Sequence, residues 1–168
     1  MEKKANSIPA GIMASAILYT IDQVTKILAK MYLSDTPGIS VIPGVFELFY
    51  LEIRGAAFGM LENRQMFFIV IALLMFGFAG YIYIKLPCSR FYTPLRIICI
   101  LIAVGAVGNM TARIVWNYVI DFLYVSLIDF PVFNIADCYV CIAAAAAVVL
   151  LFTLYKDESF DFISRGKE

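Results

Sequence analysis

Two aspartates, Asp121 and Asp137, are the side chains in this 168-residue sequence best suited to proton-transfer chemistry. Two carboxylates about 4 Å apart repel each other by roughly 4 kcal/mol at an effective dielectric constant of about 20. If the two lie that close, one keeps its proton near neutral pH and the pair titrates as a unit. The ionised member can then take a proton from water while the protonated member donates to a carbonyl oxygen, which is the chemistry of amide hydrolysis. A third carboxylate, Asp129, is expected to be solvated.

Residue types that are missing narrow the chemistry further. The chain has no histidine, which removes the commonest general base and metal ligand. Lys+Arg and Asp+Glu both number 13, so there is no net charge to recruit nucleic acid. We therefore expect no metal, no cofactor and no nucleic-acid partner.

Other polar residues fall at helical spacing within apolar stretches. Asp22 and Lys26 are four residues apart and share one helix face, as either a structural ion pair or a substrate-facing pair. Asn109 and Arg113 repeat this spacing, and Arg113 either faces the site or extends to the lipid headgroups. Asp137 has an alternative role as the cap of the helix that follows it.

The sequence Cys-Tyr-Val-Cys, from Cys138 to Cys141, offers a different chemistry. The C-x-x-C form is typical of thiol redox sites, so a membrane thiol oxidoreductase is an alternative function. Both thiols begin an apolar helix, however, and no second cysteine pair lies in an outer loop. This placement favours the carboxylate chemistry.

Membrane helices are the elements that must position these side chains. The chain is 62% hydrophobic and 15% charged, with a mean hydropathy of +0.87, whereas soluble domains are about 25% charged. Its long apolar runs predict an all-α membrane protein with four transmembrane helices. Turn residues followed by β-branched and aromatic ones predict a small extracytoplasmic β-rich segment between helices one and two. The expected ranges within this single integral membrane domain are about 8–30, 65–85, 94–115 and 137–156 for the spans, 34–64 for the β-rich segment and 157–168 for a cytoplasmic tail.

The distribution of basic residues predicts the orientation of the spans. No Lys or Arg occurs between Val115 and Cys138, so this connection is expected outside the cell. Both termini are then cytoplasmic. Because spans three and four are joined by this short outer connection, their outer ends are neighbours, which brings Asp121 and Asp137 together at the outer leaflet. The basic residues expected on the cytoplasmic side are Lys3, Lys4, Lys85, Arg90, Arg96, Lys156, Arg165 and Lys167.

Five short motifs occur in a fixed order along the chain. Together they identify a protein family more specifically than any one motif does alone. They are Asp22-Gln-Val-Thr-Lys26, Gly55-Ala-Ala-Phe-Gly59, Gly105-Ala-Val-Gly-Asn109 with Arg113, Val119-Ile-Asp121-Phe122 and Phe133-Asn134-Ile-Ala-Asp137. From about residue 22 to about residue 140, the chain resembles the lipoprotein signal peptidase family, also called signal peptidase II.

The resemblance implies a metal-free aspartyl endopeptidase of the bacterial inner membrane, with Asp121 and Asp137 as its catalytic pair. Such an enzyme would cut prolipoproteins just before a diacylglyceryl-modified cysteine, in contact with membrane lipids and as a monomer. Six residues are expected to bind substrate or orient the pair: Asn109, Arg113, Asn134, Gly55, Asp22 and Lys26.

Two positions depart from the family pattern. The family usually has Asn two places before its Gly-Ala-Ala-Phe motif, where this chain has Ile53, and Asp directly before its Arg, where this chain has Ala112. Arg113 therefore lacks its usual acidic neighbour, and we expect Glu52 to replace it. A substrate-binding paralogue that no longer cleaves is the alternative, although the intact aspartate pair favours an active enzyme.

Overall fold

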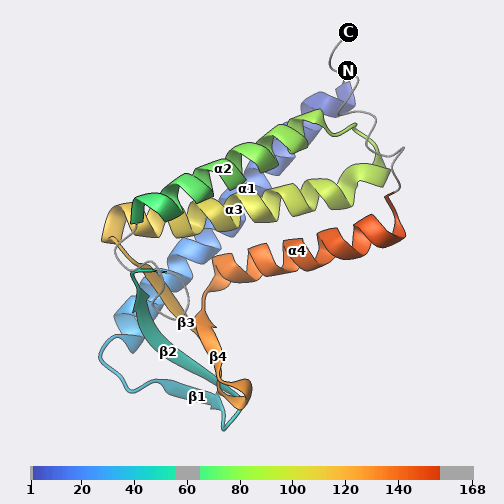
Figure 1. Cartoon of the computed structure of the whole chain (residues 1–168). Coiled ribbons are helices and arrows are strands. Elements are labelled where there is room, and N and C mark those ends of the chain that lie inside the picture. The colour runs from blue at the N-terminus through green and yellow to red at the C-terminus, as the bar shows by residue number, and fades with distance from the viewer. Residues whose placement is uncertain (1, 56–64, 156–168) are drawn as a thin grey trace.

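Four long helices form the body of the molecule in a computed structural model that describes residues 2–55 and 65–155, with residues 2–7 described by their backbone alone. All four are long and apolar enough to cross a membrane. In Figure 1 the start of α1 and the end of α4 lie at the same end of the bundle, and α3 contacts each of the other three helices. The expected tail at 157–168 and the end of the 34–64 segment lie outside the described residues. The helices are α1 (Glu2–Leu33), α2 (Gln65–Lys85), α3 (Thr93–Trp116) and α4 (Ile135–Thr153).

A four-stranded antiparallel sheet lies at the opposite end of the bundle (Figure 1). Strands β1 (Ile39–Ile42) and β2 (Phe46–Ile53) come from between α1 and α2. Strands β3 (Val119–Val125) and β4 (Phe130–Phe133) come from between α3 and α4, and the order is β1-β2-β3-β4. The four helices and a small sheet are confirmed, but placing all of the β structure between helices one and two is wrong, because half of the sheet comes from the connection between helices three and four. That connection is β-branched and aromatic, and it pairs with the edge that β2 would otherwise leave open.

Strand β3 anchors the sheet to α1. Ile120 and Phe122 are buried against Ala29 and Leu33 near the end of α1. Because successive side chains of a strand point to opposite faces, Asp121 faces away from this cluster. The backbone of Asp121 pairs with Leu51 of β2, so the carboxylate projects from the middle of the sheet.

Two helix ends deliver polar residues to the same region. Helix α3 ends at Asn117, which has the left-handed conformation (φ 62°) and donates its backbone N–H to the Arg113 carbonyl at 3.0 Å. Asparagine tolerates this conformation better than most residues. Helix α4 begins directly after β4, with Asn134 as its N-cap. The last turn of α3 and the first turn of α4 therefore flank the sheet.

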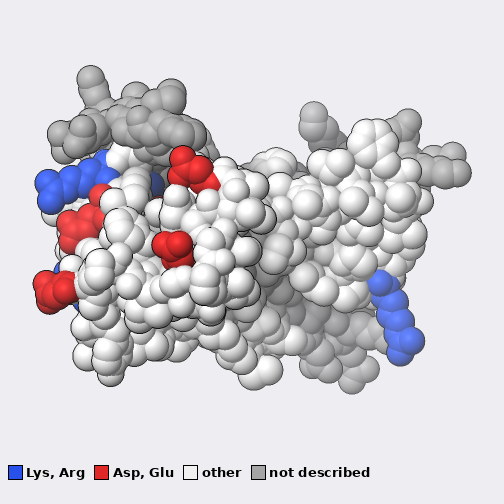
Figure 2. Space-filling view, turned by 90° about the horizontal axis from the view of Figure 1, so that it is seen from below, with Lys and Arg blue, Asp and Glu red and all other residues white. Residues whose placement is uncertain are grey.

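Apolar side chains cover much of the outside of the helices. Leu74, Phe78 and Phe152 are among the exposed ones. Figure 2 shows a largely uncharged surface over the helical part, with acidic side chains gathered toward the end that carries the sheet. Exposed apolar surface of this extent fits a lipid surrounding rather than water.

Candidate active site

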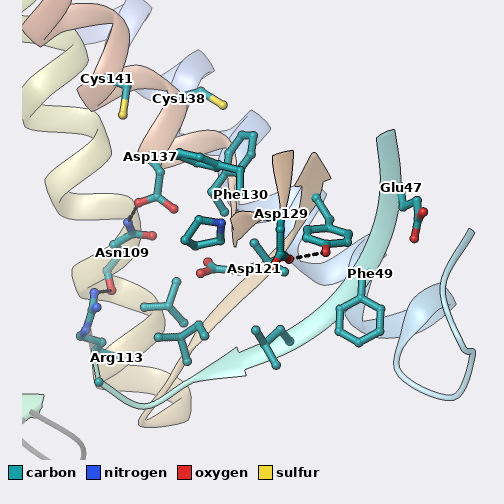
Figure 3. A pocket seen from close by; sticks show the side chains of 18 of the residues that line it. Glu47, Phe49, Asn109, Arg113, Asp121, Asp129, Phe130, Asp137, Cys138 and Cys141 are labelled. Carbon is teal, nitrogen blue, oxygen red and sulfur yellow. Dashed lines mark hydrogen bonds between the residues drawn. The ribbon is translucent and has the colours of Figure 1, made fainter. Parts of the chain in front are cut away.

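Asn134 joins the two predicted catalytic aspartates. Its side-chain Nδ2 donates to Asp121 Oδ1 at 2.6 Å, and its backbone N–H donates to Asp137 Oδ2 at 3.0 Å. Asn134 is fully buried. The two carboxylates, from β3 and α4, are thus held by one residue and face the same space in Figure 3.

The first turn of α4 fixes Asp137 through a capping box. The Asp137 backbone N–H donates to Asn134 Oδ1 at 3.2 Å, and in return the Asn134 backbone N–H donates to the Asp137 carboxylate. This reciprocal pair satisfies N–H groups that a helix start leaves unpaired. The alternative role of Asp137 as the N-cap itself is wrong, since Asn134 is the cap. Asp137 instead stabilises the helix start and also lines the cavity.

Asn109 links α3 to the same network. Its Nδ2 donates to Asp137 Oδ1 at 2.7 Å, and its Oδ1 accepts from Lys26 Nζ at 2.8 Å and from Asn134 Nδ2 at 3.2 Å. Asp137 therefore receives hydrogen bonds from two asparagines. Donors directed at both of its oxygens favour the ionised carboxylate.

Asp22 and Lys26 lie behind this network. They form a salt bridge of 2.9 Å with both side chains fully buried, and neither lines the cavity. Asp22 Oδ1 accepts from the Ala136 backbone N–H at 3.0 Å, and Gln23 Nε2 donates to Asp22 Oδ2 at 2.7 Å. Of the two expected roles, the structure shows an ion pair that connects α1 to the first turn of α4.

Arg113 sits at the edge of the cavity with a different set of neighbours from those expected. Its guanidinium carbon lies 4.8 Å from the centre of the Phe68 ring, and Nη1 donates to the Asn109 carbonyl at 3.3 Å. Among the described residues it forms no ion pair. Glu52 instead accepts from the Tyr50 hydroxyl at 2.9 Å and lies 3.8 Å from Arg54. The expectation that Glu52 holds Arg113 is therefore wrong, because Glu52 points to a neighbour on its own side of the sheet.

Burial, and after it the charge of Asp137, raise the pKa of Asp121 to about 7 against the opposing effect of the hydrogen bond from Asn134. Asp121 is 8% exposed. The surrounding charges agree with one retained proton. The cations Lys26 and Arg113 lie among three carboxyl groups, those of Asp22, Asp121 and Asp137. A proton on Asp121 therefore leaves the cluster with no net charge, which lowers the cost of burying it.

The cavity in front of the two aspartates has a volume of about 1040 Å³. Its polar lining comes from Asn109, Arg113, Asp121 and Asp137, and Gly55 also lines it. Residues 56–59 of the motif from Gly55 to Gly59 lie outside the described part of the chain. Most of the remaining lining is apolar: Phe49, Leu51, Ile53, Val119, Phe130, Pro131, Val132, Phe133 and Ile142.

Several features of this cavity were not foreseen. Asp129, expected to be simply solvated, is exposed but lines the cavity and accepts from the Tyr124 hydroxyl at 2.7 Å. Cys138 and Cys141 also line it, and neither forms a disulfide. Asn134 is among the residues expected to bind substrate or orient the pair, but its hydrogen bonds to both aspartates were not predicted. Its spacing to Asp137 indicates only the helix cap, since an Asn-x-x-Asp sequence before an apolar run marks a capped helix start. In the described ranges, no three His, Cys, Asp or Glu side chains are grouped to hold a metal ion.

Known proteins resemble this chain over most of its length. A family model described as Signal peptidase (SPase) II matches residues 14–153. A protein named lipoprotein signal peptidase from Streptococcus thermophilus (strain CNRZ 1066) is 35% identical over 153 residues, which cover 91% of this chain and 95% of that protein. Another of that name, from Streptococcus pyogenes serotype M1, is 32% identical over 149 residues, covering 89% and 95%. A solved structure described as a bacterial membrane enzyme, obtained by the in meso method at 1.9 Å resolution, superposes with a TM-score of 0.76 and 28% identity, covering 87% of this chain and 94% of that one.

Proposed function

This chain belongs to the signal peptidase II family, and we propose that it removes signal peptides from prolipoproteins with Asp121 and Asp137 as its catalytic pair. The observation that carries the assignment is the junction at Asn134, which holds both carboxylates at the wall of one cavity. The family makes the chain a peptidase. The thiol oxidoreductase alternative has no comparable support.

The hydrogen bonds support different roles for the two aspartates in this proposal. Asp137 receives donors on both oxygens and acts as the base that removes a proton from the attacking water. Asp121 keeps its proton, since burial raises its pKa to about 7, and it donates to the carbonyl oxygen of the scissile peptide. When the C–N bond breaks, Asp137 passes the proton it gained to the leaving amine, and Asp121 takes its own proton back from the hydroxyl group that becomes the new carbonyl. This mechanism requires two carboxyl groups with different pKa values, so that one is protonated while the other is ionised.

The remaining polar residues bind the substrate or hold the pair in position. Arg113, at the cavity edge and without an acidic partner among the described residues, has N–H groups left to donate to a substrate carbonyl. Gly55 leaves room for a peptide backbone to approach. Asn109 and Asn134 orient the aspartates, and the buried Asp22–Lys26 pair supports Asn109 from behind.

The apolar part of the cavity fits a lipid-modified substrate. Phe130, Val132 and Ile142 line it beside the aspartates, and a diacylglyceryl chain on the cysteine after the cleavage site would bury apolar surface there. The scissile bond is then the one just before that cysteine. Ile53, where the family usually has Asn, enlarges this apolar lining.

The topology we propose is a single integral domain in the bacterial inner membrane, acting as a monomer, with both termini cytoplasmic. The basic residues Lys85, Arg90 and Arg96 lie at the end of α2 and the start of α3, away from the sheet. By the preference of basic loops for the cytoplasm, the sheet and the aspartates belong at the outer leaflet. Reporter fusions after Ser89 and near Pro37 test this placement, the first expected inside and the second outside.

The decisive experiment measures cleavage of a diacylglyceryl-modified precursor peptide and of the same peptide without lipid. Asp121→Asn and Asp137→Asn should each lower the rate by roughly 10²–10⁴-fold or more, and the double variant should lose no more than the worse single one, because the two act as a unit. Asp129→Asn is the matched control, an exposed carboxylate of the same cavity that should keep its activity. Substantial turnover by either single variant would refute the assignment, and equal cleavage of both peptides would refute the lipid requirement.

A further inference from the structure

Arg113 is the cation at the cavity edge, and its polar neighbours do not fix its guanidinium. Nη1 donates to the Asn109 carbonyl at 3.3 Å, whereas the buried Nε has no hydrogen-bond partner among the described residues. No carboxylate in the described part of the chain lies within ion-pair distance of it. The residue before it, Ala112, is fully buried and apolar. A group other than an acid must therefore set the direction of this side chain.

An aromatic ring on α2 is the neighbour of this cation, where an acidic partner was expected. The guanidinium carbon of Arg113 lies over the Phe68 ring, 4.8 Å from its centre. The face of an aromatic ring carries partial negative charge and attracts a cation within about 6 Å. This attraction strengthens as water is excluded, and both side chains are half-buried. Phe68 can therefore hold the guanidinium without an acid.

A ring holds an arginine in a different way from a carboxylate. A carboxylate accepts two guanidinium N–H groups in a bidentate pair, whereas a ring face attracts the charge as a whole and leaves the N–H groups unoccupied. Figure 3 shows Arg113 on the same side of the cavity as Asn109 and Asp137, and all three line it. Its unoccupied N–H groups are therefore available to a peptide carbonyl near the aspartate pair.

The start of α2 is held so that Phe68 keeps this place. Gln65 Nε2 donates to the Arg54 carbonyl at 2.6 Å, which ties the first turn of α2 to the residue after β2. Phe68 lies three residues later, on the same face of the helix as Gln65. Its neighbour Phe67 is 49% exposed. The Phe68 ring thus turns toward α3, while that of Phe67 turns outward.

We propose that Phe68 is a positioning residue that directs the guanidinium of Arg113 toward a carbonyl of the bound substrate. This rests on the proposed function, because the cavity must bind a peptide. Phe68 is not among the described residues that line the cavity, so it acts through Arg113. Loss of the ring weakens substrate binding rather than the chemical step, since Arg113 holds the peptide both before and during the reaction.

The test measures kcat and KM for the lipidated precursor peptide in four full-length proteins in detergent: the wild type, Phe68→Leu, Arg113→Gln and the double variant. Phe68→Leu removes the ring face but keeps an apolar side chain. It should raise KM and lower kcat/KM by about 3- to 30-fold, the range that one cation–π contact corresponds to, with kcat near the wild-type value. In the Arg113→Gln background, which has no cation, the same change should cause no further loss.

Two further variants separate the effect of the ring from that of its bulk. Phe68→Tyr keeps the ring face and should keep the wild-type KM. Phe76→Leu is the matched control, because Phe76 lies on the same helix about two turns further on and is 47% exposed. It should leave KM unchanged. The melting temperature of each protein shows whether a loss of activity comes from a loss of folding.

Three results would overturn the proposal: a wild-type KM in Phe68→Leu, a loss of the same size in the Arg113→Gln background, or a KM in Phe68→Tyr as high as in Phe68→Leu at an unchanged melting temperature. Failure of the proposed function is a separate result, since it appears as a wild type that does not cleave the peptide. The melting temperatures of the four proteins then report the contact alone, and additive shifts would refute the coupling of Phe68 to Arg113.

Discussion

Lys26 Nζ donates to the side-chain oxygen of Asn109 at 2.8 Å, and this contact determines which way the Asn109 amide faces. With its oxygen turned to Lys26, Asn109 presents its N–H₂ group to Asp137 at 2.7 Å. A buried cation on α1 thereby orients a carboxylate on α4 through a residue of α3. Lys26 is a positioning residue in this arrangement, because it touches neither the cavity nor the substrate.

Lys26→Met should lower both stability and activity. It removes one partner of a fully buried ion pair and leaves Asp22 uncompensated, a change that costs about 3–5 kcal/mol. Adding Asp22→Asn removes that charge and should recover much of the melting temperature in detergent. Cleavage should recover less, because Asn109 still lacks the donor that orients it.

Lys30→Met is the matched control for this effect. Lys30 lies one turn along α1, is exposed, and donates to the Tyr118 hydroxyl at 2.7 Å. Its loss should leave kcat near the wild-type value. A double variant Asp22→Asn/Lys26→Met that recovers stability and kcat together would show that Lys26 acts only through folding.

Cleavage should decline as the pH rises through about 7. Burial and the charge of Asp137 raise the pKa of Asp121 to about 7, and above this pH Asp121 no longer holds the proton that it donates in the proposed mechanism. A profile of kcat/KM against pH for the lipidated peptide should therefore show an alkaline limb with an apparent pKa near 7. A rate that is constant from pH 6 to pH 9 would contradict the role of Asp121 as acid.

The same pKa makes stability depend on pH. In the unfolded chain Asp121 releases its proton near its ordinary pKa of 3.8, whereas the folded protein keeps it to about 7. Between these values the folded state binds more protons, so the free energy of unfolding falls as the pH rises, by roughly a few kcal/mol across the window. The melting temperature of the wild type should drop between pH 5 and pH 8, and that of Asp121→Asn should change less. Equal slopes for the two proteins would show that Asp121 is not the titrating group.

The helices and the residues of the site were readable from the sequence for separate reasons. Long apolar runs predict membrane helices because a helix satisfies its backbone hydrogen bonds within one segment in lipid, and the structure has all four. The carboxylates and asparagines stood out because polar residues are costly in such a setting.

Contacts between distant segments were the part that the sequence could not supply. The pairing of β2 with β3 joins residues about 70 positions apart, and the local sequence of Val119–Val125 does not show which strand it pairs with. The error on Glu52 has the same origin. The backbone of Glu52 pairs with Ile120 of β3, and its side chain lies against Arg54, two residues further along the chain, rather than against Arg113.

Glu52→Gln should consequently have little effect. Its salt bridge with Arg54 is exposed, with side-chain exposures of 34% and 59%, and such pairs contribute about 0–1 kcal/mol. Arg113→Gln should reduce cleavage markedly, because it removes the cationic donor at the cavity edge. Measuring kcat/KM for both variants in parallel tests whether Glu52 is independent of Arg113. A strong loss of activity in Glu52→Gln alone would show that Glu52 contributes to catalysis after all.

The close packing of α3 against α4 gives a last prediction. A Cβ atom at Gly105 would lie 2.7 Å from the Ala136 carbonyl oxygen and 2.6 Å from a Val140 methyl group, both too short for ordinary contact. Gly105→Ala must therefore push the first turn of α4 away from α3, at a cost of about 1–3 kcal/mol. This displacement lengthens the Asn109–Asp137 hydrogen bond, so kcat should fall more than the loss of stability explains. Gly77→Ala on α2 is the control, since nothing lies within 4 Å of a Cβ placed there. If Gly105→Ala melts at a lower temperature but retains the wild-type kcat, the spacing between α3 and α4 does not set the geometry of Asp137.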